Sequence, residues 1–445
     1  MSKWKKNVFY ALCILILLPI ILFTTVDITP LKNQQYYKES KKIISEIKKI
    51  QPDSALVEAG WSEAHITPNF PVKVIGFGKN NYHEKVLDSI FVRSIVFKQG
   101  KKNYLYLAYD LLIVHPFFVK ELEKELEKNH IFFDGIFYTA THTHNAIGSY
   151  ADKIGGYFSL GGKDQKVIDF LINQTIESVR ESIFKLSKVD YTYRTIPTSG
   201  LVGNRLNKVN GGIDSNLRIL FLRNESKKVM ALITYAAHAT CLPRKLNMIS
   251  ADYPGALIKG VNELDEIDFA IFSAGAVASH EPLLPDFSTE IKNNYANNLI
   301  NCIKNNIPVK DSFKPLQSVL YYQISLPLRT PHLKVGRYIR LRPFIFEWIL
   351  GKGVGKLSFL KMDDVCFIGT PCDFSGELML EIEKENKANS ITPIITSFNG
   401  EYIGYITSDK YYYWDAHEVR DVNWFGPYNG KYFKESILES LLKIE

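Results

Sequence analysis

Two hydrophobic patterns alternate along the chain from Ala55 onward. Apolar runs rich in β-branched and aromatic residues predict strands, and segments with apolar residues three and four positions apart predict helices. The predicted strands are residues 89–97, 104–109, 132–141, 191–196, 217–222, 229–235 and 268–272. The predicted helices are residues 117–128, 165–186, 253–264, 291–306, 377–386 and 433–443. This interleaving predicts an α/β fold, a layered mixed β-sheet with flanking helices, in one domain over residues 55–445.

The first thirty residues have a different pattern. Lys3, Lys5 and Lys6 precede an uncharged apolar run over residues 8–26. As a helix this run would span roughly 28 Å, the thickness of one hydrocarbon core. Lysines before the run and a large domain after it predict a single-pass membrane protein whose large domain is extracytoplasmic. We expect residues 1–30 to be an uncleaved signal anchor; the alternative is a signal peptide whose removal releases a secreted protein.

Two later segments also combine positive charge with apolar positions. Residues 31–54 form a Lys-rich stalk or linker with isoleucines at helical spacing, which predicts either a helix lying on anionic headgroups or a solvated linker helix. Residues 328–350 begin with several basic side chains and end in the apolar run 344–350. That pattern is typical of a segment that enters a membrane interface or guides an amphiphile, and equally of an ordinary surface helix.

Composition and charge narrow the function classes. The chain has 445 residues, of which 46% are hydrophobic and 23% charged, and this excludes a disordered chain. The net charge is +7, but nine lysines and three acidic residues fall within the first 50 positions, so the remainder is nearly neutral. A neutral body argues against a nucleic-acid partner. The five cysteines show no CxxC spacing, so we predict neither a disulfide framework nor a cysteine metal site.

A candidate metal site begins at the end of the predicted strand 132–141. His142 and His144 follow it with one residue between them. Because strand side chains alternate between faces, the two imidazoles are expected on the same face, about 7 Å apart along the chain. Two imidazoles just past the carboxyl end of a strand suit a metal ion in the crevice of an open α/β sheet.

Three further polar residues follow other predicted strands. His238 follows residues 229–235, Asp373 follows residues 365–368, and Tyr405 follows residues 393–396. Taken singly, an aspartate in this position is more often a helix cap and a tyrosine more often a core residue. Their shared placement at strand ends indicates one site.

These motifs, in this order, resemble the catalytic N-terminal domain of the neutral, non-lysosomal ceramidase family. The resemblance extends from about Val57 to the C-terminal end. The residues that carry it are Ala64-His65-Ile66-Thr67-Pro68, Ile75-Gly76-Phe77-Gly78, Ala140-Thr141-His142-Thr143-His144, Gly203-Asn204-Arg205, Ala237-His238, Ser250-Ala251-Asp252, 275–282, 371–374 and 402–407.

The resemblance implies a zinc-dependent amidohydrolase, and the N-terminal apolar run predicts that it is membrane-anchored. Such an enzyme hydrolyses the N-acyl amide of ceramide, or of a related N-acyl lipid, to a fatty acid and an amine by attack of zinc-bound water. Its implied partners are a lipid or other N-acylated amphiphilic substrate and the membrane, and not nucleic acid. The implied Zn²⁺ ligands are His142, His238, Asp373 and Tyr405. His144 is implied beside the metal, and Arg205 opposite the scissile carbonyl.

Two departures from the family pattern bear on activity. Asp373 stands where the family usually has glutamate, and the shorter carboxylate still suits zinc. The family segment Gly-Asp-x-Ser-Pro reads Ala278-Ser279-His280-Glu281-Pro282 here, with Glu281 in place of the serine. Glu281 is therefore expected either to act as general base, with His280 or His144 as proton donor, or to form a structural ion pair.

Three functions follow from these alternatives. The first is the ceramidase-like amidase described above. The second is a zinc hydrolase of the same fold that acts on a different amide or ester, such as an envelope component. The third is a ceramidase-like binding protein without turnover, because the family serine is replaced by Glu281.

Overall fold

The computed structural model describes residues 3–285 and 288–445. The first half of the chain contributes most strands of a large mixed β-sheet. Its strands lie in the order β15-β13-β12-β10-β2-β6-β7-β8, and β17 pairs with β10. The β7–β8 and β13–β15 pairs are parallel and the others antiparallel. The bounds are β2 (Glu58–His65), β6 (Phe91–Gln99), β7 (Lys102–Tyr109), β8 (Gly135–Ala140), β10 (Ser187–Pro197), β12 (Asn216–Asn224), β13 (Val229–Tyr235), β15 (Phe269–Ala274) and β17 (Lys314–Pro315).

A second sheet packs face to face on the first. It has the order β18-β20-β21-β23, with β18 (Val319–Leu326), β20 (Gly355–Met362), β21 (Val365–Gly369) and β23 (Thr392–Thr396). Buried side chains from both sheets share one cluster, in which Tyr106 stacks on Phe137 and meets Phe367 edge-on. Strands such as β7 and β13 are buried on both faces, which explains why they read as nearly continuous apolar runs, whereas β18 is buried mainly at alternate positions.

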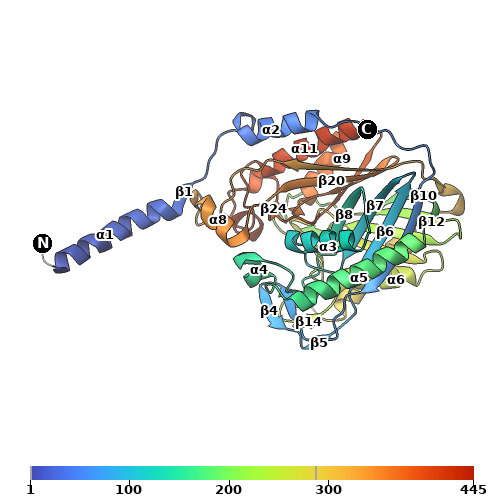
Figure 1. The fold of residues 1–445 in the computed structure, drawn as a ribbon, viewed down its shortest axis with the longest axis horizontal. Helices are drawn as coiled ribbons and strands as arrows, with labels where there is room; N and C mark the ends of the chain where they lie inside the picture. The colour runs from blue at the N-terminus through green and yellow to red at the C-terminus, as the bar shows by residue number, and fades with distance from the viewer. Residues whose placement is uncertain (1–2, 286–287) are drawn as a thin grey trace.

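Helices cover both outer faces, so the layers are helix, sheet, sheet, helix (Figure 1). On the large sheet lie α3 (Pro116–Lys128), α5 (Gln165–Phe184), α6 (Asp252–Asn262) and α7 (Ile291–Lys304). On the second sheet lie α2 (Gln35–Ser45), α9 (Gly376–Glu385) and α11 (Asn429–Ile444). This confirms the layered α/β architecture with a mixed sheet.

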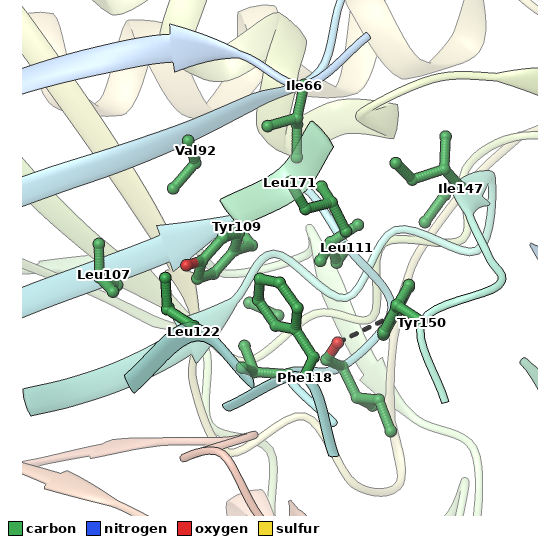
Figure 2. Packing of buried hydrophobic residues seen from close by; sticks show 14 of the residues in the cluster. Ile66, Val92, Leu107, Tyr109, Leu111, Phe118, Leu122, Ile147, Tyr150 and Leu171 are labelled. Atoms are coloured by element: carbon green, nitrogen blue, oxygen red, sulfur yellow. Dashed lines mark hydrogen bonds between the residues drawn. The ribbon is translucent and has the colours of Figure 1, made fainter. Parts of the chain in front are cut away.

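The helix–sheet core shows why the apolar periodicity predicts these helices. Figure 2 shows Phe118 and Leu122 of α3 and Leu171 of α5 facing Leu107 and Tyr109 of β7, and all five side chains are fully buried. Each helix directs one apolar stripe at the sheet and its charged positions at solvent.

Loops and short elements near the carboxyl ends of β8, β13 and β21 carry the candidate residues, of which Glu281, Asp373 and Tyr405 lie on the short elements. The short elements include β3 (Lys73–Gly76), β4 (Lys79–Tyr82), β5 (Lys85–Val86), β9 (Ala146–Ile147), β11 (Val202–Asn204), β14 (Met248–Ile249), β16 (His280–Pro282), β22 (Asp373–Phe374), β24 (Tyr405–Ile406), α4 (Lys153–Ser159) and α10 (His417–Arg420). The parallel pair β22–β24 places Asp373 beside Tyr405, which lie 32 positions apart in the sequence.

The N-terminal apolar run is shorter as a helix than the sequence predicts. Helix α1 (Lys3–Leu22) passes through Pro19 and ends at Leu22. Residues 23–25 instead form β1 (Phe23–Thr25), which pairs antiparallel with β19 (Ile339–Leu341). Among the described residues, one helix, α1, is long and apolar enough to cross a membrane. A signal sequence has similar length and composition, so these two properties fit either a membrane anchor or a signal sequence.

The Lys-rich segment after it is part of the folded body. Helix α2 packs through Ile44 against the second sheet. Tyr37 donates a hydrogen bond to Glu435 of α11, and Lys41 forms an ion pair with Glu439 of the same helix. Residues 35–45 are therefore neither a solvated linker nor a helix held only by headgroups.

The cationic part of residues 328–350 is largely buried. Arg329, His332 and Arg340 are each less than 10% exposed. Arg340 donates to the Gly336 carbonyl (2.8 Å) and to the Tyr412 hydroxyl (2.9 Å), and that hydroxyl lies 2.9 Å from His332 Nε2. Exposed apolar side chains lie at Val335, Tyr338 and Ile339, at and just before the start of β19, and on the outer face of α8 (Pro343–Leu350).

This burial predicts an acid-sensitive contribution to stability. Burial and the guanidinium groups of Arg340 and Arg329 lower the pKa of His332 from 6.5 to about 3. Below pH 6.5 the His332 imidazole binds a proton in the unfolded chain but stays neutral in the folded chain. The free energy of unfolding therefore falls as the pH falls toward 3. We expect the free energy of unfolding to drop by about 2 kcal/mol more between pH 7 and pH 5 in the wild type than in His332→Gln. Urea unfolding of both proteins in the same detergent measures this difference, and equal drops would contradict it.

Candidate metal centre

Three side chains from separate loops meet at the carboxyl ends of β8, β13 and β21. His142 Nε2 lies 3.3 Å from Asp373 Oδ1, and His238 Nε2 lies 3.4 Å from the same oxygen. His238 and Asp373 are fully buried and His142 is 3% exposed. Residues far apart in the chain thus place two imidazole nitrogens around one carboxylate oxygen.

Backbone carbonyls orient both imidazoles. His142 Nδ1 donates to the Leu112 carbonyl (2.7 Å), and His238 Nδ1 donates to the Val277 carbonyl (2.8 Å). A proton on each Nδ1 leaves the Nε2 lone pairs directed at Asp373, which is the arrangement of metal-ligating histidines. Burial and the neighbouring Arg205 lower the pKa of His238 to about 4, so its ring is neutral near pH 7.

The backbone at His142 corrects the reasoning by which the pair was predicted. Strand β8 ends at Ala140, and His142 has a left-handed φ of +62°. Strand alternation therefore does not bring the imidazoles together. A turn after the strand does, and it places the Nε2 atoms of His142 and His144 3.2 Å apart.

Asp373 has one satisfied and one unsatisfied oxygen. Its Oδ2 accepts a hydrogen bond from the Tyr402 hydroxyl (2.9 Å), whereas the buried Oδ1 has no hydrogen-bond partner among the described residues. Burial raises the pKa of Asp373, and only positive charge beside Oδ1, on the two imidazoles or on a bound cation, holds that pKa below its usual range. An anionic oxygen that faces two nitrogen lone pairs in a buried site is costly unless a cation lies between them.

Tyr405 and Arg205 complete one side of the group. The Tyr405 hydroxyl lies 3.1 Å from His238 Nε2, and Arg205 Nη2 lies 3.4 Å from that hydroxyl. Burial raises the pKa of Tyr405 well above its usual value. Glu418 of α10 pairs with Arg205 Nε and holds the guanidinium in this position.

His144 lies at the exposed side of the group. Its ring packs against Phe77 with 4.7 Å between ring centroids, and its buried Nδ1 has no hydrogen-bond partner among the described residues. Burial and the neighbouring His142 hold the pKa of His144 well below its usual value. The ligand nitrogens of His142, His144 and His238 all lie within 4.8 Å of one another, so this cluster can bind a metal ion.

A cavity of about 360 Å³ leads from this group to the surface. Its inner end is lined by His142, His144, Tyr402 and Tyr405. Toward the surface it is lined by α4 and α8 and by the loop that follows α8. A cavity of this size with an apolar wall and convergent polar groups at one end is typical of a small-molecule site.

Glu281 is not brought into this group. It lies on β16 opposite Gly203 of β11, does not line the cavity, and its carboxylate makes no hydrogen bond or ion pair with another described residue. The neighbouring His280 is buried, and its Nε2 accepts a hydrogen bond from the Asp214 amide (2.9 Å). His280 therefore packs away from the cavity as well.

The sequence reasoning missed two residues that orient the site. Tyr402 lies in the motif 402–407 and bonds Asp373, but nothing in its spacing indicates that role. Glu418 pairs with Arg205 from a helix that is 213 positions away in the sequence. Neither contact leaves a local signal.

Comparison with known proteins gives a clear result for the fold. Scans against protein-family models and against curated proteins find no match. Among solved structures, the neutral ceramidase from Pseudomonas aeruginosa matches with a TM-score of 0.74 and 14% identity over 88% of this chain and 75% of that one. A ceramidase complexed with C2 matches with a TM-score of 0.72 and 14% identity over 87% and 74%. The chain therefore has the neutral ceramidase fold.

Proposed function

We propose that this protein is a membrane-anchored, zinc-dependent amidohydrolase that cleaves the N-acyl amide of ceramide or a related N-acyl lipid into a fatty acid and an amine. The observation that carries this proposal is the buried, unsatisfied Asp373 Oδ1 facing the Nε2 lone pairs of His142 and His238. The catalytic domain would lie outside the cytoplasm, attached by α1.

The donor set and its spacing support zinc. Tetrahedral zinc with bonds of about 2.0–2.2 Å has neighbouring ligand atoms about 3.3–3.6 Å apart. The separations between the imidazole nitrogens and Asp373 Oδ1 are 3.3 and 3.4 Å, and Tyr405 lies 3.1 Å from His238. We assign His142, His238, Asp373 and Tyr405 as the residues that would hold it. Zinc bound there would act as a Lewis acid and activate water near neutral pH.

The surrounding side chains support acyl transfer. Arg205 keeps a half-buried positive charge beside the Tyr405 hydroxyl, and this charge would stabilise the negative charge that develops on the substrate carbonyl oxygen. His144 faces the cavity with one ring nitrogen unpartnered, and it would accept and return a proton. The apolar wall that includes Phe158, Phe346 and Leu350 supports a substrate with a hydrocarbon chain.

Metal content and product release test this function together. We expect the purified full-length protein to hold about one zinc per chain and to release fatty acid from ceramide faster than from other N-acyl lipids. Zinc with turnover only on another amide or ester would support the same-fold hydrolase of an envelope component. A metal-free protein without turnover would support the binding protein.

His144 and Glu281 are the two candidates for general base, and the geometry favours His144. We expect His144→Gln to lower kcat by about 10²–10⁴ and Glu281→Gln to leave it within about threefold, because only His144 lines the cavity. Steady-state kinetics on the zinc-loaded variants measures both. The reverse result would assign the base to Glu281, as the replacement of the family serine suggests.

A further inference from the structure

Helix α1 is joined to the body without a flexible linker. Its last residue is followed at once by β1, whose Phe23 and Thr25 pair with Leu341 and Ile339 of β19. The Arg342 amide donates to the Leu22 carbonyl (2.8 Å), and Arg342 Nε donates to the Ile20 carbonyl (3.1 Å). A cation at the C-terminal end of α1 also complements the helix dipole. Figure 1 shows α1 leaving the body directly beside α8.

Helix α8 begins immediately after Arg342 and has two apolar faces. On its inner face, Phe346 is buried against Trp424 and Phe425, with 5.3 and 5.9 Å between ring centroids. On its outer face, Phe344 is 56% exposed and Trp348 is 68% exposed. The outer rings are not needed to close the core.

Helix α4 lies against α8 and also carries exposed aromatic side chains. A Cβ atom at Gly155 would lie 2.2 Å from Leu350 Cδ2, so the glycine permits the close approach of the two helices. Tyr157 is 58% exposed and Phe158 is 69% exposed on the same helix. The exposed rings Tyr157, Phe158, Phe344 and Trp348 are called the aromatic rim here: they lie on the two helices that line the cavity, and Phe158 itself lines it.

Positive charges accompany the aromatic rim. Lys153 precedes the exposed rings of α4, Arg342 precedes those of α8, and Lys352 follows α8; all three are exposed. Exposed aromatic rings with lysine and arginine beside them are typical of segments that enter the headgroup region of a bilayer. The cations would pair there with anionic headgroups.

We propose that the aromatic rim enters the interface of the same bilayer that holds α1. The β1–β19 pairing and Arg342 fix α1 beside α8, so anchoring one brings the other to the lipid surface. The cavity then opens against lipid, and a substrate reaches the metal centre from the bilayer without crossing water. The docking rests on the retention of α1, and the entry route also rests on the proposed function.

Tryptophan fluorescence tests the docking without reference to catalysis. Full-length protein is reconstituted into vesicles of phosphatidylcholine and phosphatidylglycerol at about 4:1, and the Trp348 signal is obtained by difference from Trp348→Phe. We expect the Trp348 signal to fall at least twofold when the phosphatidylcholine is replaced by 6,7-dibromophosphatidylcholine. Aqueous iodide should leave the signal unchanged. The matched control adds Phe184→Trp to Trp348→Phe, since Phe184 is 85% exposed and lies beside Trp61 and Ser187, away from the cavity lining.

The control signal should respond to iodide and not to the brominated lipid. If Trp348 behaves like the control, or if the mass of the mature protein lacks residues 1–22, the docking proposal is overturned.

A second measurement tests the entry route. We expect the double variant Phe344→Asp, Trp348→Asp to hydrolyse N-acyl lipid in vesicles at least tenfold more slowly than the wild type, and the same lipid in detergent micelles within twofold. Equal losses in vesicles and micelles would overturn the entry route. No hydrolysis by the wild type in either medium would count against the proposed function, while the fluorescence result would still decide the docking.

Discussion

Replacement of Asp373 by asparagine is expected to lower bound zinc from about one to below about 0.1 per chain and kcat by at least about 10³. The asparagine keeps the shape of the side chain but removes the charge that the buried Nε2 atoms of His142 and His238 face. Without an anionic ligand the site loses the group that compensates the charge of the cation, and metal affinity falls accordingly. Elemental analysis of the purified variant measures this independently of any activity.

Tyr402→Phe is the matched control for this substitution. It removes only the hydrogen bond to Asp373 Oδ2 and leaves the ligand atoms in place. Loss of such an orienting bond typically costs 10–100-fold in metal affinity, so excess zinc should restore the variant. Wild-type zinc content in Asp373→Asn would contradict the assignment of this residue as a ligand.

Replacement of Arg205 by leucine is expected to lower kcat by about 10²–10³ while zinc content stays near one per chain. The guanidinium lies beside Tyr405 and is not itself a metal ligand, so its loss removes charge stabilisation in the transition state rather than the metal. Kinetics at saturating substrate, together with elemental analysis of the same sample, separates the two effects.

A control is needed because the Arg205→Leu substitution leaves the buried Glu418 carboxylate without its partner. Truncating one member of a buried ion pair is destabilising, so the variant Arg205→Leu, Glu418→Gln checks that the loss is not caused by misfolding. Glu418→Gln alone keeps the positive charge and weakens its orientation, and we expect a fall in kcat of only about tenfold. A turnover of Arg205→Leu within twofold of wild type would exclude the proposed role.

The layered fold could be predicted because its information is local. Period-two and continuous apolar runs identified strands such as β6 and β13, and three-to-four spacing identified helices such as α3 and α5. The predicted ends of helices and strands are less accurate, because contacts with distant segments determine where an element stops. Residues 23–26 are apolar enough to continue α1, yet residues 23–25 pair with β19 instead.

The candidate site was predicted in part. The sequence placed His142, His238, Asp373 and Tyr405 after strands, and the resemblance to ceramidases grouped them with Arg205. The structure brings these side chains within 3.5 Å of a neighbour in the group. Glu281, singled out because it replaces a serine, lies outside the cavity. A position in an aligned motif fixes the place in the chain but not the direction of the side chain.

The sequence by itself therefore determined the order of strands and helices, the apolar N-terminal helix and the chemical types of residue that follow each strand. Only the tertiary structure decided which of these side chains meet. Asp373 and Tyr405 become neighbours through the β22–β24 pair, and His142 turns toward them through a left-handed backbone conformation. Both depend on contacts between segments about 30 residues apart, and such non-local contacts leave no periodicity in the chain.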